Sequence, residues 1–125
     1  MSLLKNLTPH SISVFAADGK TLLVTVPPSG EVARVSVSRV ETGVVPIEPD
    51  AAAILRHDPL AGIPVFVGTY GSVTGLPAPA LGTIYIVSAM VRQAVPTRRD
   101  VLSPGELIRD AAGQPLGCRG LEANA

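Results

Sequence analysis

Thr83-Ile-Tyr-Ile-Val87 is the stretch that decides the fold class, because all five residues are β-branched or aromatic. Its uninterrupted apolar character predicts a strand that is buried on both faces. Ser88 follows and is expected to cap a short helix over residues 89–95, which Pro96 ends. This step from strand to helix would place Ser88 at a sheet end, where free amide protons can bind an anion.

Short apolar segments punctuated by proline and glycine surround this stretch, which is typical of β proteins. Asp18-Gly19 is a strong hairpin turn signal, and Gly71-Ser72 is read as a second turn. Pro46 and Pro49 make residues 42–49 irregular, and Asp50 is expected to cap a helix over residues 51–56. The expected strands are residues 11–16, 21–26, 31–40, 64–70, 73–76, 83–87, 106–109 and 116–121.

The pattern as a whole predicts a mainly β protein, either a β-sandwich or an open barrel of about six to eight short strands. One or two short helices accompany the strands, and an α+β arrangement is the alternative. The 125 residues fall within the usual range for one domain, so residues 1–125 are expected to form a single β-rich domain.

The composition narrows the classes of function. Ten basic and ten acidic side chains give zero net charge, which argues against nucleic-acid binding. No stretch approaches the roughly 20 apolar residues of a spanning helix, and no signal peptide is evident, so we expect a cytoplasmic protein without membrane contact. Charged residues make up only 16 %, too few to coat a whole monomer, which favours a homo-oligomer.

A few residues are able to carry chemistry. His10 can act as a base, an acid or a hydrogen-bonding group, and Cys118 becomes a nucleophile only beside a base such as His10. The alternatives are structural roles, in which the His10 imidazole supports the first strand and Cys118 is a small buried thiol. Two histidines and one cysteine without ligand spacing predict no metal site, and no motif for a cofactor is present.

Arg98 and Asp100 belong to the densest charge cluster of the chain. A guanidinium fork suits a carboxylate or phosphate, and a neighbouring carboxylate can orient it. The alternative is an Arg–Asp pair that only anchors a loop. Ser88 lacks the Gly-x-Ser-x-Gly elbow of a serine nucleophile, which leaves capping as its expected role.

Several strings together resemble a group of small uncharacterised proteins of bacteria and their phages that open with Asn-Leu-Thr-Pro-His. The resemblance spans most of the chain and implies a phage or prophage origin, but it implies no activity. This chain departs from the pattern at Arg99, where an acid is expected, and it is longer between Val40 and Gly62. The strings are Asn6-Leu-Thr-Pro-His10, Pro28-Ser-Gly30, Ala33-Arg34-Val35, Tyr85-Ile-Val-Ser88, Ala94-Val-Pro96 with Arg98 and Asp100, and Gly117-Cys118.

These observations leave three hypotheses for the function. The first is a module that binds a small anionic molecule or nucleotide, with sequestration as one use of that binding. The second is a structural or interaction protein, either a virion accessory or an inhibitor of a host protein. The third is a small hydrolase using Cys118 and His10, although the balance is against an enzyme. The ligand-binding residues of the first hypothesis are Asn6, Thr8, His10, Ser88, Arg98 and Asp100.

Overall fold

The computed structural model describes residues 2–46 and 62–125, and the helix expected over residues 51–56 lies outside this part. The chain divides into two compact units. One comprises Met1–Val35 with Ser72–Ala125, and the other comprises Ser36–Gly71. Among the described residues no helix is long and apolar enough to cross a membrane.

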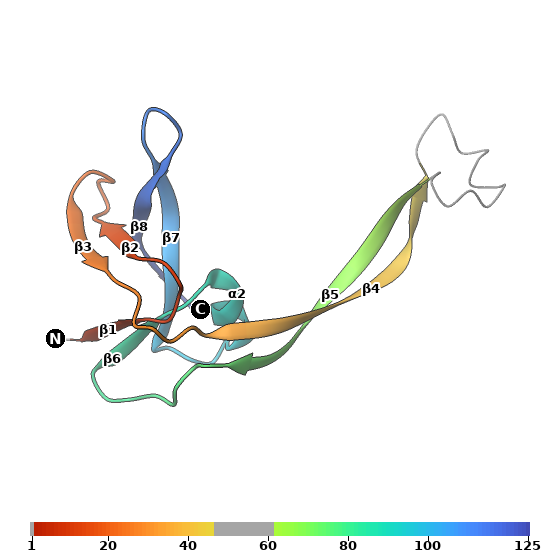
Figure 1. Cartoon of the computed structure of the whole chain (residues 1–125), viewed down its shortest axis with the longest axis horizontal. Helices are drawn as coiled ribbons and strands as arrows, with labels where there is room; N and C mark the ends of the chain where they lie inside the picture. The colour runs from red at the N-terminus through yellow and green to blue at the C-terminus, as the bar shows by residue number, and fades with distance from the viewer. Residues whose placement is uncertain (1, 47–61) are drawn as a thin grey trace. The chain divides into compact units, whose positions relative to one another are not determined.

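The fold is mainly β, as expected, with one short helix in the described part. Figure 1 shows the strands of the first unit curling into a barrel-like sheet and β4 and β5 running side by side. In chain order the elements are β1 (Leu3–Asn6), β2 (Ile12–Phe15), β3 (Leu22–Val26), β4 (Arg34–Pro46), β5 (Gly62–Thr74), β6 (Thr83–Ile86), α2 (Ala89–Ala94), β7 (Val101–Arg109) and β8 (Pro115–Ala123).

The six-stranded sheet has the order β1-β6-β7-β8-β2-β3. Its pairing is mixed: β6 is parallel to both neighbours and β8 is parallel to β2, whereas β7–β8 and β2–β3 are antiparallel. The turn between β2 and β3 forms at Asp18-Gly19, as expected, with Gly19 at a φ of 70°. The Asp18 carboxylate accepts hydrogen bonds from the backbone N–H groups of Lys20 and Thr21, which lower its pKa to about 2.

The two edge strands of this sheet approach each other, so the sheet is nearly closed. A parallel bridge joins Asn6 at the end of β1 to Pro28, just beyond β3. Around it, Ser29 N–H donates to the Asn6 carbonyl at 3.0 Å, and Ala33 N–H donates to the Leu7 carbonyl at 2.9 Å. Closure of this kind removes exposed edges from a β-sheet.

β6 is buried on both faces, as its sequence predicts. Tyr85 and Val87 pack in one apolar cluster, which also contains Val91 of α2. Ile86 points into the other cluster, together with Val14 and Cys118. The strand therefore separates two apolar clusters. One contains residues of β2, β3 and β8, and the other contains Val91 of helix α2.

Helix α2 begins as the sequence predicts. Ser88 is the N-cap, and its Oγ accepts a hydrogen bond from Val91 N–H at 3.3 Å. This contact satisfies one of the amide protons that a helix start leaves without an intrahelical partner. The helix ends at Ala94, one residue before the expected limit, and Pro96 follows soon after.

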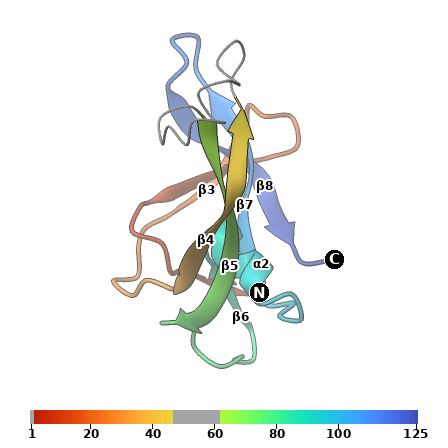
Figure 2. The ribbon, with the colours of Figure 1, turned by 90° about the vertical axis from the view of Figure 1, so that its right-hand side faces the viewer.

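The second sheet corrects the strand assignments in the middle of the chain. β4 continues to Pro46, where residues 42–49 were expected to be irregular, and β5 runs unbroken through the expected Gly71-Ser72 turn. Gly71 is compatible with a strand because it lies against Ser36, whose side chain occupies the space of a Cβ. β4 and β5 lie side by side in both views (Figure 1, Figure 2).

Two further strand assignments were wrong. β1 was not expected, because its four residues mix apolar and polar types without a clear alternation. β7 begins at Val101 rather than at residue 106 and contains Pro104, a residue type that is disfavoured inside strands. Pro104 is nevertheless paired with Leu121 in the ladder with β8. Long-range pairing has therefore overridden a local signal at both strands.

Candidate functional site

The opening Asn-Leu-Thr-Pro-His segment is held by the side chain of Asn6. Its amide nitrogen donates to the carbonyls of His10 at 2.7 Å and Val26 at 3.0 Å. Its Oδ1 accepts from the backbone N–H of Thr8 at 2.9 Å and from the Thr8 hydroxyl at 2.7 Å. Asn6 is almost completely buried, so these four hydrogen bonds occupy its polar atoms and leave none for a ligand.

His10 lies at the surface beside these hydrogen bonds of Asn6. Its carbonyl accepts hydrogen bonds from Asn6 and from the Thr8 hydroxyl, the latter at 3.1 Å. Its side chain is exposed. Within the described part of the chain, no hydrogen bond joins the His10 imidazole to another group. Thr8 and His10 therefore share one turn with Asn6, as the resemblance grouped them, and the contacts that define it are structural.

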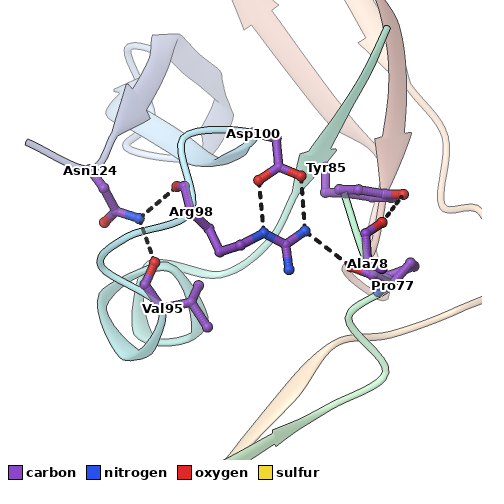
Figure 3. A network of polar contacts seen from close by, with 7 residues as sticks. All are labelled: Pro77, Ala78, Tyr85, Val95, Arg98, Asp100 and Asn124. Carbon is purple, nitrogen blue, oxygen red and sulfur yellow. Dashed lines mark hydrogen bonds and ion pairs between the residues drawn. The ribbon is translucent and has the colours of Figure 1, made fainter. Parts of the chain in front are cut away.

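Arg98 and Asp100 form a bidentate ion pair, drawn in Figure 3. Arg98 Nε and one terminal nitrogen each donate to an Asp100 oxygen at 2.8 Å. The same terminal nitrogen donates to the Pro77 carbonyl at 3.0 Å. These hydrogen bonds raise the pKa of Arg98 and lower the pKa of Asp100. The guanidinium is thus engaged by the chain itself, in the loop-anchoring arrangement that was the alternative to anion binding.

Buried polar side chains that the sequence did not single out lie next to this pair. Asn124 donates to the carbonyls of Val95 at 2.9 Å and Arg98 at 3.1 Å (Figure 3). Arg92 on α2 donates from Nε to the fully buried Ser103 hydroxyl at 2.8 Å and contacts Asn124 Oδ1 at 3.2 Å. Isolated Ser and Asn residues carry no sequence signal for burial, since both types are mostly exposed.

Cys118 lies in the core between the sheet strands, and only 3 % of its surface is exposed. Its thiol donates to the Ser13 carbonyl at 3.6 Å. In the described residues no hydrogen bond connects it to His10. This setting fits the small buried apolar residue better than the activated nucleophile.

The predicted ligand-binding residues therefore occupy separate places in the polar network. Asn6, Thr8 and His10 share one cluster, Arg98 and Asp100 share another, and no hydrogen bond joins the two in the described part. Ser88 lines a third place, an open pocket of about 250 Å³. Such a volume is below the roughly 300–1,000 Å³ of small-molecule sites. The pocket lining is mostly apolar and comprises Pro9, Val32, Ala33, Arg34, Val35, Ser88, Met90 and Val91.

Two observations on the polar groups of the described residues bear on metal and ligand binding. No group of three His, Cys, Asp or Glu side chains gathers there in a metal-binding arrangement. Every buried side-chain nitrogen and oxygen in this part has a hydrogen-bond partner. A binding site usually leaves some polar groups free to meet the ligand.

The surface of the β4–β5 hairpin differs from these buried polar groups, because it exposes large apolar side chains. Side chains alternate between the two faces of a strand. Arg39 lies 4.6 Å from the centre of the Phe66 ring, so these two residues share one face. The other face, called here the apolar face, carries no charged residue between positions 36 and 44 of β4. Its large side chains are Val40, Val44, Ile63, Val65 and Val67, which are 39–63 % exposed.

Comparisons of the chain with protein-family models, with curated proteins and with solved structures found no match.

Proposed function

We propose that this chain is a structural protein that works by binding other protein chains, and that the β4–β5 hairpin is its contact surface. The observation that carries the proposal is the apolar face, five exposed valine and isoleucine side chains on a two-stranded sheet. Two-stranded sheets are marginally stable in water unless further strands or a packed surface cover them. A hairpin with strands of 13 residues is therefore expected to be covered by a partner.

Hydrophobic contact alone would hold a partner only if the partner covered most of this face. Burying one valine or isoleucine side chain completely contributes about 1.5–3 kcal/mol. Association costs about 4–15 kcal/mol in lost translational and rotational freedom. Because these side chains are 39–63 % exposed, covering one of them contributes only about half of that amount. Contact with one or two of the five side chains would therefore not offset the cost. An extended partner surface, such as a neighbouring sheet or strand, meets the requirement.

The polar residues of the first unit support the same reading. Their hydrogen bonds are made within the chain, which favours a rigid support over a site that must rearrange to admit a ligand. The resemblance to small phage and bacterial proteins supports a role in a phage or prophage assembly inside the bacterial cytoplasm. In this proposal the chain performs no reaction of its own.

Native mass spectrometry of the gently purified protein tests the proposal, with two double variants compared with wild type. Val40→Ser/Val67→Ser removes two side chains of the apolar face. Leu107→Ser/Leu116→Ser is the matched control, because these leucines are both 50 % exposed but lie on β7 and β8.

We expect wild type and the control to be recovered in protein assemblies, and the hairpin variant to be recovered alone. Resistance of Cys118 to a thiol reagent would show that the first unit of each variant is folded, because that cysteine is buried. If the hairpin variant retains the same protein partners as wild type, the proposal is wrong. A wild-type monomer carrying only a stoichiometric small molecule would instead favour the ligand-binding hypothesis.

A further inference from the structure

Taking the proposed function as given, we infer that the partner of the hairpin is a second copy of this chain, and that two β4 strands pair edge to edge, antiparallel, about a two-fold axis at Val40. Among residues 2–46 and 62–125, β4 has only β5 as a neighbour in its sheet. Its other edge therefore presents backbone N–H and C=O groups without strand partners, which is a template for another strand.

The composition of the two strands distinguishes β4 from β5 as the pairing edge. β5 contains Pro64 in its interior, and glycines at 62, 68 and 71. Proline removes a donor from a ladder and glycine weakens a strand. β4 has a single internal glycine, Gly43, and its only proline is at its last position. The row of backbone N–H donors is therefore unbroken along β4 up to its last residue, whereas Pro64 interrupts the row on β5.

Charge determines the register. In an antiparallel pair centred on Val40, each residue faces its counterpart at an equal distance on the other side of Val40. Arg39 of one copy is then opposite Glu41 of the other, and the two-fold axis repeats the pair. Ser38 faces Thr42 in the same register, which adds a pair of hydroxyl groups.

Registers centred one residue away lose this complementarity. A centre at Arg39 places two guanidinium groups opposite each other, and a centre at Glu41 does the same for two carboxylates. Like charges directly opposite are destabilising. Within the described part of the chain neither Arg39 nor Glu41 has an ion-pair partner. Arg39 does contact the Phe66 ring of β5, so pairing with Glu41 of a second copy would have to keep or replace that contact.

Sedimentation velocity of the full chain tests the inference with reciprocal charge changes. R39E leaves glutamates at both positions and E41R leaves arginines at both, so either variant repels its own copies in the proposed register. We expect each to raise the dissociation constant by roughly tenfold or more, because two symmetry-related pairs become repulsive. The double variant R39E/E41R should associate like wild type, and a 1:1 mixture of R39E and E41R should form mixed dimers.

Lys20→Glu is the control for the charge change of R39E, since Lys20 is exposed and lies in the β2–β3 turn. It should leave association unchanged. A wild-type chain that stays monomeric at high concentration would overturn the inference, as would failure of the double variant and of the mixture to associate. Association that survives R39E and E41R but is lost in Val40→Ser/Val67→Ser would refute this edge and register alone and leave the hairpin as the contact surface.

Discussion

The side chain of Asn6, at the end of β1, donates a hydrogen bond to the carbonyl of Val26, at the end of β3, across the gap where the six-stranded sheet nearly closes. In the described part of the chain, a single backbone bridge spans this place, between Asn6 and Pro28. The same amide group also holds the His10 carbonyl. One buried side chain thus connects both edges of the sheet to the turn that follows β1.

Replacing Asn6 should destabilise the first unit strongly. Asn6→Ala removes four hydrogen bonds and leaves the buried Val26 carbonyl without this donor, for which we expect a loss of about 2–4 kcal/mol. Asn6→Asp should be worse near neutral pH, because it replaces the donating amide with a buried carboxylate. Urea unfolding of each variant, together with hydrogen exchange of the β6 amides, measures the change in the free energy of unfolding. Equal stability of Asn6→Ala and wild type would show that the closure does not depend on this side chain.

The Arg98–Asp100 pair should make stability depend on pH at the acid end. Its hydrogen bonds place the folded-state pKa of Asp100 below the ordinary value of 3.8. A lowered pKa contributes stability that is present above the unfolded-state pKa and is lost as the pH falls through the folded-state pKa. The free energy of unfolding should therefore decline below about pH 4 as this carboxylate is protonated.

Asp100→Asn isolates that contribution. We expect the variant to be less stable than wild type by about 1–2 kcal/mol at neutral pH, because Arg98 loses a charged partner in a half-buried place. The difference should shrink as the pH falls below about 4. Asp18 also has a lowered pKa, of about 2, so it contributes to the acid dependence of both proteins and cancels in the difference between variant and wild type. A difference that is independent of pH would contradict the assigned role of the carboxylate.

Much of the barrel-like unit was predictable from local sequence. Thr83-Ile-Tyr-Ile-Val87 predicted a doubly buried strand, and Ser88 with Pro96 predicted both ends of α2. The hairpin was not predictable, because Pro46 and Gly71 read locally as breaks. In the structure, Pro46 lies at the end of its strand and Gly71 lies against Ser36. Both readings depend on contacts between residues far apart in sequence.

The polar residues show a different limit of sequence reasoning. The residue types singled out as ligand groups, such as Asn6 and Arg98, have the same chemistry whether they meet a ligand or the chain's own carbonyls. Only their neighbours decide between the two, and here the neighbours are Val26 and Pro77. Buried Ser103 and Asn124 gave no signal at all, because nothing in the adjacent sequence marks a serine or asparagine as internal.

Gly117 should not tolerate a side chain. A Cβ at this position would meet the Ser13 carbonyl oxygen and would lie 2.9 Å from the Phe15 ring, where β8 runs parallel to β2. Gly117→Ala is expected to destabilise the protein by about 1–3 kcal/mol, the range for overpacking a core. Gly43→Ala is the matched control, because no atom lies within 4 Å of its Cβ position. Thermal unfolding of both variants decides the point, and equal effects would argue against the close approach of β2 and β8.

Cys118 should be inert in the folded protein. Because the thiol is 3 % exposed, its reaction with an aromatic disulfide should be at least about 100-fold slower than in urea, where the chain is open. Cys118→Ala should cost about 1 kcal/mol through lost packing. Fast reaction of the native thiol would reopen the nucleophile hypothesis. Slow reaction would also validate this cysteine as the reporter of folding for the hairpin variants.

The last prediction concerns the contact between Arg92 and Ser103, which ties α2 to β7. Arg92→Met keeps the apolar stem of the side chain but leaves the fully buried Ser103 hydroxyl without its donor, so a loss of about 2 kcal/mol is expected. Ser103→Ala alone leaves Arg92 Nε unpaired and should cost about 1 kcal/mol. In the double variant neither group is left behind, and its loss should be smaller than the sum of the two by about 1 kcal/mol. Urea unfolding of the three variants completes the cycle. Strict additivity would mean that water replaces either partner without penalty, and that α2 is held by Val91 in the core and by Arg92's contact with Asn124.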